Sequence, residues 1–467
     1  MDECKLSFDN DNQVTYLSIT RNPVPHTIVI DALTRETIDR FKYWAANYPA
    51  QFKRDDLRVL GLHLYNMIFP PDSDIRKEFE QDYKYFNEKL AEGKKKGEEH
   101  RLRVTLVFNK DARALADYPW EFLYVPLGGK GFFMAGEKTE LILARFIPDA
   151  TVDWEPDEQP LRILIVLAWA KGMPQIEAEY VIDFIEKLAD PDHIEVKTER
   201  EPTYSKLSEI INDKHSAEYF PPHILHFIGH GDPGKLYLVK SKELAQDEML
   251  RSGAKEPDYK DPTDGETFSK LFHHNPPKLV FLHACEGAKP GSIDGFNDIA
   301  HELVYSNVPA VVAMQYEIQN EAASRFALEF YKKISEGYDI DEAVKEGRWK
   351  LGNPDAGSTG AWNDRSFGTP VLYLQREVPI IKKVKPGERV ETGAPSKPPA
   401  GGKVPCPNGN CIGMVQPGDK ICLICNTYIM ECPQCHRLID RDIHKCANCL
   451  WGITTTAQPL PPQGDRL

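Results

Sequence analysis

Two residues that could form a catalytic dyad follow two predicted strands. His230 lies between two glycines after the apolar run at residues 223–228, and Cys285 follows a second apolar run at residues 278–283. A thiol needs a base to become a thiolate at neutral pH, and imidazole has a suitable pKa. Catalytic groups of open α/β sheets lie at the carboxyl ends of strands. The 55 positions between the two residues allow one crossover to a nearby strand, so the side chains could meet at one edge.

The cysteine and the histidines could also have purely structural roles or a different chemical role. An isolated cysteine at a strand end is often a small buried apolar residue. His223, His226 and His230 could also suggest a metal site. On a strand, however, residues 223 and 226 point to opposite faces, which argues against a three-histidine cluster. We therefore expect His226 to be a packed core histidine.

Eight of the ten cysteines form a repeated pattern near the C-terminus. Each half of the pattern supplies four thiols in two close pairs, which is typical of a closed, tetrahedral structural zinc site. Iron–sulfur binding is the alternative. A unit this small has no core, so metal ligation is expected to drive its folding. The spacing predicts two Zn²⁺ ions in a module that resembles a double zinc ribbon, with the ligands Cys406, Cys411, Cys422, Cys425, Cys432, Cys435, Cys446 and Cys449.

This module could dock a protein or bind nucleic acid. From Lys382 onward there are 11 basic and 7 acidic residues, so this part carries +4. Such a small excess, with Asp440 and Asp442 among the basic residues, favours protein docking over nucleic acid. The residues that could make a nucleic-acid surface are Tyr428, Arg437, Arg441, Lys445 and Trp451.

The elements that must position the dyad follow an alternating pattern of strands and helices. Six runs predict strands, and the segments between them have helical spacing, so the sequence predicts a mostly parallel α/β sheet with flanking helices. The predicted strands are residues 161–168, 193–198, 223–228, 278–283, 309–315 and 369–374. A further strand is expected at residues 101–108, and a small one at 235–240.

The chain divides into five predicted regions. A helix-rich N-terminal α/β extension precedes the sheet region, whose core spans residues 160–376. A Pro-, Gly- and Lys-rich stretch without apolar periodicity is typical of a flexible linker. The expected regions are the extension at 1–99, the sheet region at 100–381, the linker at 382–405, the double zinc ribbon at 406–452 and a disordered tail at 453–467.

Several segments together resemble the CHAT family of caspase-like cysteine peptidases, relatives of separases, metacaspases and gingipains. They are HILHFIGHGD, LVFLHACEGA, NVPAVVAMQYEIQNEAASRFALEFY, FGTPVLYL and the upstream DYPWEFLYVP. The resemblance covers roughly residues 100–376 and implies a caspase-like six-stranded sheet. It implies that Cys285 is the nucleophile, that His230 handles the proton, and that the N–H groups of Gly231 and Cys285 form the oxyanion hole.

The substrate preference is less defined. A basic substrate side chain would require a buried carboxylate, and Asp232, Glu286 and Asp294 are the candidates by position. Each could equally be a solvated loop residue. The chain departs from the family pattern at Phe367, where tryptophan is common, and at Glu286-Gly287, but neither change affects the dyad.

Composition excludes several other classes of protein. The chain has 467 residues, with 41% hydrophobic and 27% charged residues, as in ordinary globular proteins. The net charge of −14 argues against a chain that mainly coats nucleic acid. No apolar run approaches the length of about 18 residues needed to span a membrane, and the first residues lack a signal-peptide core. We therefore expect a cytoplasmic protein.

These observations together predict a cytoplasmic cysteine endopeptidase that cleaves protein substrates and docks through its zinc ribbons. The family resemblance implies a regulated prokaryotic stress or antiphage effector, activated by a partner protein or a ligand. Two alternatives remain open: a catalytically inactive caspase-like scaffold, and a nucleic-acid-binding protein that acts through the ribbons.

Overall fold

The computed structural model of the chain describes residues 1–382 with gaps, and four short segments beyond them. The gaps are residues 11–12, 20–21, 28–31, 49–52, 99, 128, 138–139, 148–154, 159, 174–177, 191–192, 233, 285–295, 307, 317, 319, 354–364 and 376–378. The later segments are residues 404–405, 414–415, 429–431 and 438–440. Residues 1–383 form one compact unit, and residues 384–467 form a second.

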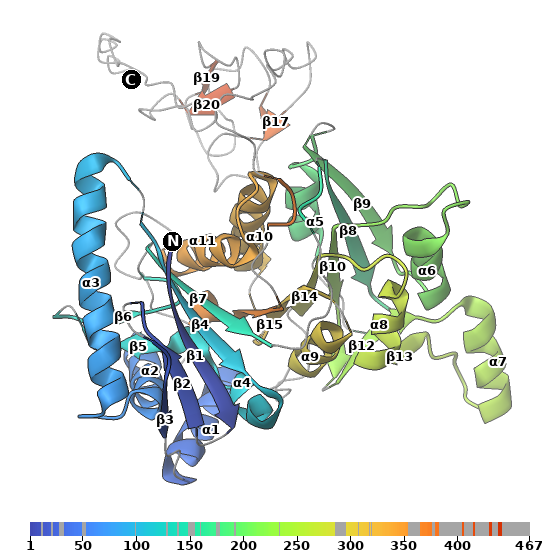
Figure 1. Ribbon diagram of the computed structural model, residues 1–467. Coiled ribbons are helices and arrows are strands. Elements are labelled where there is room, and N and C mark those ends of the chain that lie inside the picture. Colours follow the sequence, from blue (N-terminus) through green and yellow to red (C-terminus); the bar gives the residue numbers. More distant parts are fainter. Residues whose placement is uncertain are drawn as a thin grey trace, which may run out of the picture. The chain divides into compact units, whose positions relative to one another are not determined.

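The first unit is built on one large sheet, which has eleven strands among the described residues (Figure 1). Most neighbouring strands are parallel, and the pairs β3–β2, β2–β1 and β15–β16 are antiparallel. In spatial order the strands are β3 (Val24–Thr27), β2 (Gln13–Leu17), β1 (Asp2–Asn10), β4 (Leu102–Phe108), β7 (Leu141–Phe146), β16 (Pro370–Leu374), β15 (Ala310–Met314), β14 (Leu279–Ala284), β10 (Ile224–Gly229), β8 (Leu161–Ala168) and β9 (Ile194–Arg200).

The central strands are apolar along their whole length because helices cover both of their faces. Along β8, Ile163 and Ile165 pack into one hydrophobic cluster, whereas Leu164 and Val166 pack into another. The first cluster includes residues of α5 (Glu179–Glu186), α10 (Asn320–Ser335) and α11 (Ile340–Gly352), and we call this side the α10 face. The second includes residues of α6 (Tyr204–Asn212), α8 (Gly265–Ser269) and α9 (Asn297–Tyr305), and we call it the α9 face.

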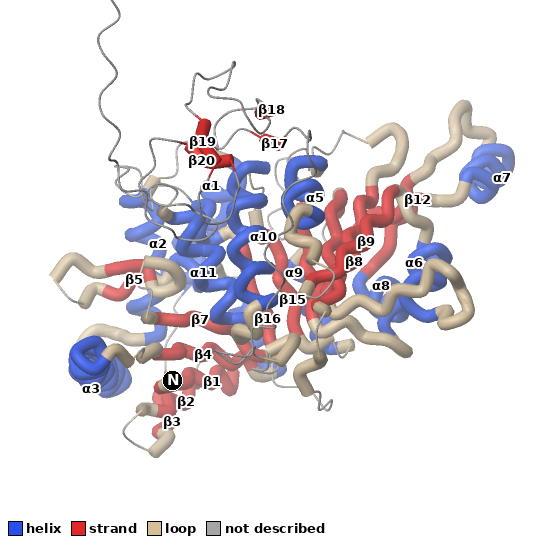
Figure 2. Tube along the Cα trace, turned by 90° about the horizontal axis from the view of Figure 1, so that it is seen from above, coloured by secondary structure: helices blue, strands red, loops and turns tan. Residues whose placement is uncertain are grey.

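Three helices come from the N-terminal part of the chain: α1 (Ala32–Asn47), α2 (Arg54–Ile68) and α3 (Asp74–Lys96). Helix α2 ends just before Pro70, which cannot continue a helix. Helix α3 begins after Ser73, whose side chain accepts a hydrogen bond from the Arg76 N–H at 3.4 Å, and it ends at Gly97 with φ of 74°. In Figure 2 the strands form a continuous band among the helices.

Smaller elements complete the first unit. A separate sheet in the order β11 (Gly231–Asp232), β12 (Lys235–Val239) and β13 (Lys260–Asp264) follows β10, with α7 (Lys242–Ser252) between its last two strands. The strands β5 (Tyr124–Val125) and β6 (Phe132–Phe133) pair as a hairpin. The short helices are α4 (Arg113–Ala116), η1 (Lys110–Ala112), η2 (Trp120–Phe122), η3 (Lys270–Phe272) and η4 (Arg365–Gly368).

The mostly parallel α/β sheet with flanking helices is confirmed, but a sheet of six strands is too small. The six predicted strands are neighbours, from β16 to β9, and the sheet then continues through β7, β4, β1, β2 and β3. Strand β1 lies parallel to β4, with Asp2 opposite Leu102 and Phe8 opposite Phe108. This pairing joins segments about a hundred residues apart, and no local sequence pattern encodes it.

A buried ion cluster around Glu121 of η2 ties the upstream segment to the sheet region. The Glu121 carboxylate pairs with Arg145 of β7 and lies 3.2 Å from the Arg348 guanidinium of α11. It also accepts a hydrogen bond at 3.3 Å from Gln315, the residue that follows β15. Burial lowers the pKa of Arg348 to about 10. The segment DYPWEFLYVP therefore contributes a structural carboxylate to the core.

Two short hairpin-like pairs are described in the second unit. Strand β17 (Val404–Pro405) pairs with β18 (Met414–Val415), and β19 (Ile429–Glu431) pairs with β20 (Leu438–Asp440), both antiparallel. Ile429, in β19, is buried. All eight clustered cysteines lie outside the described residues.

Candidate active site

Three central strands end level with one another at the carboxyl edge of the main sheet. Strands β8, β10 and β14 are parallel, and Gly229 of β10 lies opposite both Ala168 of β8 and Ala284 of β14. The next residue after Gly229 is His230. Cys285 follows Ala284 in the sequence and lies outside the described residues, as do Glu286 and Asp294.

His230 is buried, with 4% of its surface exposed. Its main-chain carbonyl accepts a hydrogen bond from the Tyr237 N–H at 3.1 Å, which anchors the end of β10 to β12. The sequence prediction that this histidine stands at the end of a central strand agrees with the structure. The main chain at His230 is therefore held on one side by β10 of the main sheet, which it follows, and on the other by β12 of the small sheet.

Gly231 begins the small hairpin and faces Leu236 of β12. Because the neighbouring residue pair, His230 and Tyr237, is hydrogen-bonded, the pair of Gly231 and Leu236 is a non-hydrogen-bonded one. The Gly231 N–H therefore points away from β12. A Cβ at this position would lie 2.4 Å from Cε1 of Phe296 and 2.7 Å from the Lys235 carbonyl oxygen, so only glycine fits.

Asp232, a candidate for binding a basic substrate residue, is exposed. Its carboxylate accepts a hydrogen bond from the Tyr237 hydroxyl on the adjacent strand. This bond is the main cause that raises the pKa of Tyr237 to about 12. The carboxylate is thus held in place by β12, although it is not the buried group that we expected a basic side chain to require.

Two histidines lie deeper on the α10 face, below the carboxyl edge. His226 is fully buried, stacks on Phe281 with ring centroids 4.3 Å apart, and its Nδ1 lies 2.7 Å from the Tyr331 hydroxyl of α10. His283 of β14 is also buried, and its ring centroid is 5.7 Å from that of His226. Burial lowers the pKa of His283 to about 4, and it lowers the pKa of His226 well below its usual value.

The opposite, amino edge of the sheet holds His223 in a different environment. Its Nε2 lies 2.8 Å from Arg162 and 3.2 Å from the Asp157 carboxylate, which also pairs with Lys278 at 2.5 Å. Burial, followed by the nearby guanidinium of Arg162, lowers the pKa of His223 to about 4. His223 and His226 thus have separate partners. Among the described residues no group of three or more His, Cys, Asp or Glu side chains could hold a metal ion.

The same Asp157 fixes the end of the described first unit. Its N–H donates to the Ile380 carbonyl at 3.0 Å, and its own carbonyl accepts from the Lys382 N–H at 2.9 Å. Residue 381 forms an isolated parallel bridge with residue 157. The chain therefore leaves the sheet at the amino edge, opposite the edge that carries His230.

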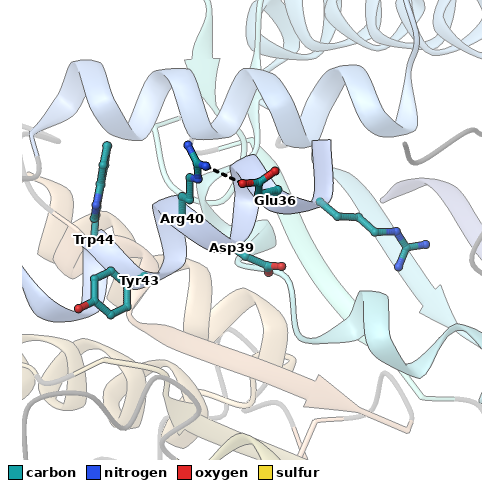
Figure 3. Close-up of a pocket in the computed structure, with 6 residues that line it drawn as sticks. Glu36, Asp39, Arg40, Tyr43 and Trp44 are labelled. Carbon is teal, nitrogen blue, oxygen red and sulfur yellow. Dashed lines mark hydrogen bonds and ion pairs between the residues drawn. The ribbon is translucent and has the colours of Figure 1, made fainter. Parts of the chain in front are cut away.

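A hollow of about 610 Å³ lies along the exposed side of α1 (Figure 3). It is lined by Arg35, Glu36, Asp39, Arg40, Tyr43 and Trp44. Arg40 is bonded to Glu36 at 2.5 Å, and Figure 3 shows Trp44 and Tyr43 pointing in different directions from the helix. These side chains do not converge on one point, so the carboxyl edge remains the better candidate for chemistry.

Sequence reasoning did not single out His283 or Trp169, the residue after Ala168. Both positions depend on strand register, because neither residue has a local motif of its own. The register that brings Ala168, Gly229 and Ala284 level is set by packing across β8, β10 and β14.

The protein is thus an α/β protein with a histidine, His230, at the carboxyl edge of its main sheet, directly after a central parallel strand. The chain belongs to the CHAT domain family, whose pattern matches residues 58–370. No curated protein sequence matches the chain.

The solved structures that match the chain are distant from it. Separase of Saccharomyces cerevisiae, in its complex with securin, is 14% identical with a TM-score of 0.33, over 76% of this chain and 23% of that one. The Arg-specific cysteine proteinase gingipain R is 10% identical with a TM-score of 0.36, over 76% and 77% of the two chains. Caspase-1 of Spodoptera frugiperda is 12% identical with a TM-score of 0.29, over 51% and 96%. The chain thus spans less than a quarter of the separase length.

None of the helices in the described part of the chain combines the length and the apolar character that a membrane span requires.

Proposed function

We propose that the protein is a cysteine endopeptidase in which Cys285 is the nucleophile and His230 its proton-handling partner. The observation that carries this proposal is the register of β10 and β14. Gly229 of β10 lies opposite Ala284 of β14. In the sequence, His230 directly follows Gly229, and Cys285 directly follows Ala284. Neighbouring strands are about 4.8 Å apart, so side chains that leave them at the same level are within reach of each other.

The proposed reaction proceeds through a thioester. The Cys285 sulfur, with its proton transferred to His230, attacks the scissile carbonyl carbon, and the carbonyl oxygen becomes an oxyanion. His230 gives its proton to the leaving amine as the C–N bond breaks. Water then attacks the thioester, with His230 accepting a proton from it, and the acid product leaves as the thiol is restored.

The oxyanion would be stabilised by main-chain donors at the same edge. The Gly231 N–H points away from β12, as its non-hydrogen-bonded pairing requires, and so it is directed out of the hairpin. The N–H of Cys285 is the second proposed donor. Removing one such donor typically costs about 10²–10³ in rate.

The test uses a thiol-directed peptide probe and a protein substrate. We expect Cys285→Ala and His230→Ala each to abolish cleavage while the fold is kept, since the nucleophile or its proton partner is lost. Cys4→Ala is the matched control, because Cys4 is fully buried and burial raises the pKa of its thiol to about 12, which keeps it protonated. Undiminished cleavage by purified Cys285→Ala would contradict the proposal.

We further propose that the second unit holds two structural Zn²⁺ ions. Thiolate pairs suit tetrahedral zinc, and each described strand pair brackets one cysteine pair in the sequence. Cys406 and Cys411 fall between β17 and β18, and Cys432 and Cys435 fall between β19 and β20. Because each cysteine pair lies in one short connection between paired strands, both of its thiolates could reach the same ion.

Elemental analysis tests the metal assignment. We expect two zinc ions per full-length chain and essentially none in a protein that ends at Lys382. The first unit is compact by itself, so the shortened protein is a fair comparison. Stoichiometric zinc in the shortened protein, or iron with visible absorbance in the full chain, would show that the assignment is wrong.

The proposed biological role is that of a regulated prokaryotic stress or antiphage effector. In this role a protein substrate or an activating partner binds the zinc ribbons, and the first unit performs the chemistry. Support comes from the separation of the chain into two units and from the opposite signs of their charges, −16 for residues 1–383 and +2 for residues 384–467.

A further inference from the structure

We infer that Trp169 is a specificity-determining residue that selects an apolar substrate side chain within about three residues of the scissile bond. This inference rests on the proposed peptidase function and adds a substrate class to it.

The placement of Trp169 follows from strand register. Ala168, Gly229 and Ala284 are level across β8, β10 and β14. The residues that come next in the sequence are Trp169, His230 and Cys285. Trp169 therefore stands at the carboxyl edge beside the strand that carries His230, and it is one strand further from the nucleophile position.

The alternation of residues along β8 and β10 places Trp169 and His230 on the same side of the sheet, the α10 face. Residues of β8 alternate between the two faces, and Leu167 belongs to the cluster of the α10 face. Ile228, two residues before His230, belongs to that cluster as well. Trp169 continues the alternation of β8 by one step, and it packs against the same cluster while remaining partly exposed.

The ring of Trp169 offers a ligand carbon surface rather than a hydrogen bond. Its Nε1–H donates to the Met173 carbonyl at 3.2 Å, and Gly172, with φ of 93°, allows the loop to fold back for this bond. The side chain is partly exposed, and its polar atom is already bonded within the loop, so an apolar partner is favoured.

The distance to the scissile bond sets the substrate position. Cys285 and Trp169 follow strands that are two positions apart, which is about 10 Å at the usual strand spacing. An extended peptide covers about 3.4 Å per residue, so a chain that crosses the strand ends would reach Trp169 in about three residues.

The experiment compares kcat/KM of full-length wild type and variants on a peptide library in which each position near the cleavage site is varied. We expect wild type to prefer Leu or Phe over Gly at one position. In Trp169→Ala, kcat/KM for the Leu and Phe peptides should fall about tenfold, which is typical of a lost apolar contact. The Gly peptide should be cleaved at the wild-type rate, and Trp169→Phe should keep most of the preference.

Trp44→Ala is the matched control, because this tryptophan is 50% exposed on α1 and should leave the preference unchanged. Equal preferences in wild type and Trp169→Ala would overturn the inference while the peptidase assignment stands. A preference for Lys or Arg that disappears in Trp169→Ala would overturn the apolar class. Absence of any cleavage that depends on Cys285 would instead remove the proposed function, and this inference with it.

Discussion

Single residues at the carboxyl edge are fixed by contacts from other elements rather than by their own motifs. Gly231 is the clearest case, because its missing side chain leaves room for the ring of Phe296 and for the Lys235 carbonyl. The Gly-His-Gly motif in the sequence suggests backbone freedom. In the structure, Phe296, the residue before α9, packs closely against the hairpin of β11 and β12. This close packing is what requires glycine at position 231.

We expect Gly231→Ala to destabilise the protein by about 1–3 kcal/mol, the usual cost of overpacking. The added methyl group would lie 2.4 Å from the Phe296 ring, so one of the two must move. Peptidase activity should fall more steeply than stability, since a shift of this N–H weakens the proposed oxyanion site. Urea unfolding and peptide cleavage at one temperature measure the two effects.

The matched comparison is Gly231→Ala combined with Phe296→Leu, which removes the clashing ring edge. The double variant should regain part of the free energy of unfolding, because contacting residues are not additive. If the loss of stability is the same with and without Phe296, the clash is not the cause.

At the scale of elements, β10 and β14 carry buried neutral histidines directly below the proposed dyad. The pKa values of His226 and His283 are lowered in the folded protein, so the unfolded chain binds more protons between about pH 4 and 6.5. The contribution of these histidines to the free energy of unfolding should therefore be constant above about pH 6.5 and fall as the pH decreases through this window. His223 at the amino edge acts in the same direction.

Each such histidine contributes a slope of up to about 1.4 kcal/mol per pH unit. We expect His283→Leu to reduce this slope when the free energy of unfolding is followed by denaturant titration from pH 7 to 4.5. His273→Leu is the control, because His273 is exposed on the loop after η3. A slope that is unchanged by His283→Leu would show that this imidazole is not responsible.

Elements were easier to predict than the way they pair. Helices were predicted between the strands from helical spacing, and α10 (Asn320–Ser335) is one of those that the structure contains. Strand β7 was not among the predicted strands, although its sequence LILARF is apolar. Strand β1 finds its parallel partner β4 across the first helices, and local patterns carry no information on such contacts. For the same reason Trp169 and His283 escaped notice, whereas His230 had a glycine motif. Cys285 remains a prediction from sequence and register.

At the scale of the whole molecule, the proposed chemistry belongs to the first unit and the proposed recruitment to the second. A protein that ends at Lys382 should still react with a thiol-directed peptide probe, if any required activator is present, but should cleave its natural protein target poorly. The quantity to measure is the ratio of protein cleavage to probe labelling, with and without the second unit. An unchanged ratio would mean that the zinc ribbons do not recruit the substrate.

The anchoring of Ile380 and Lys382 by Asp157 makes the amino edge the fixed end of a tether. If the 21 residues between Lys382 and Val404 behave as the flexible linker that the sequence predicts, their root-mean-square span is about 25 Å. A protein held by the second unit would then be confined near the first at millimolar effective concentration. Cleavage would depend on how far a bond lies from the docking site as well as on its sequence. Lengthening or stiffening the linker should move the preferred cut along the same substrate.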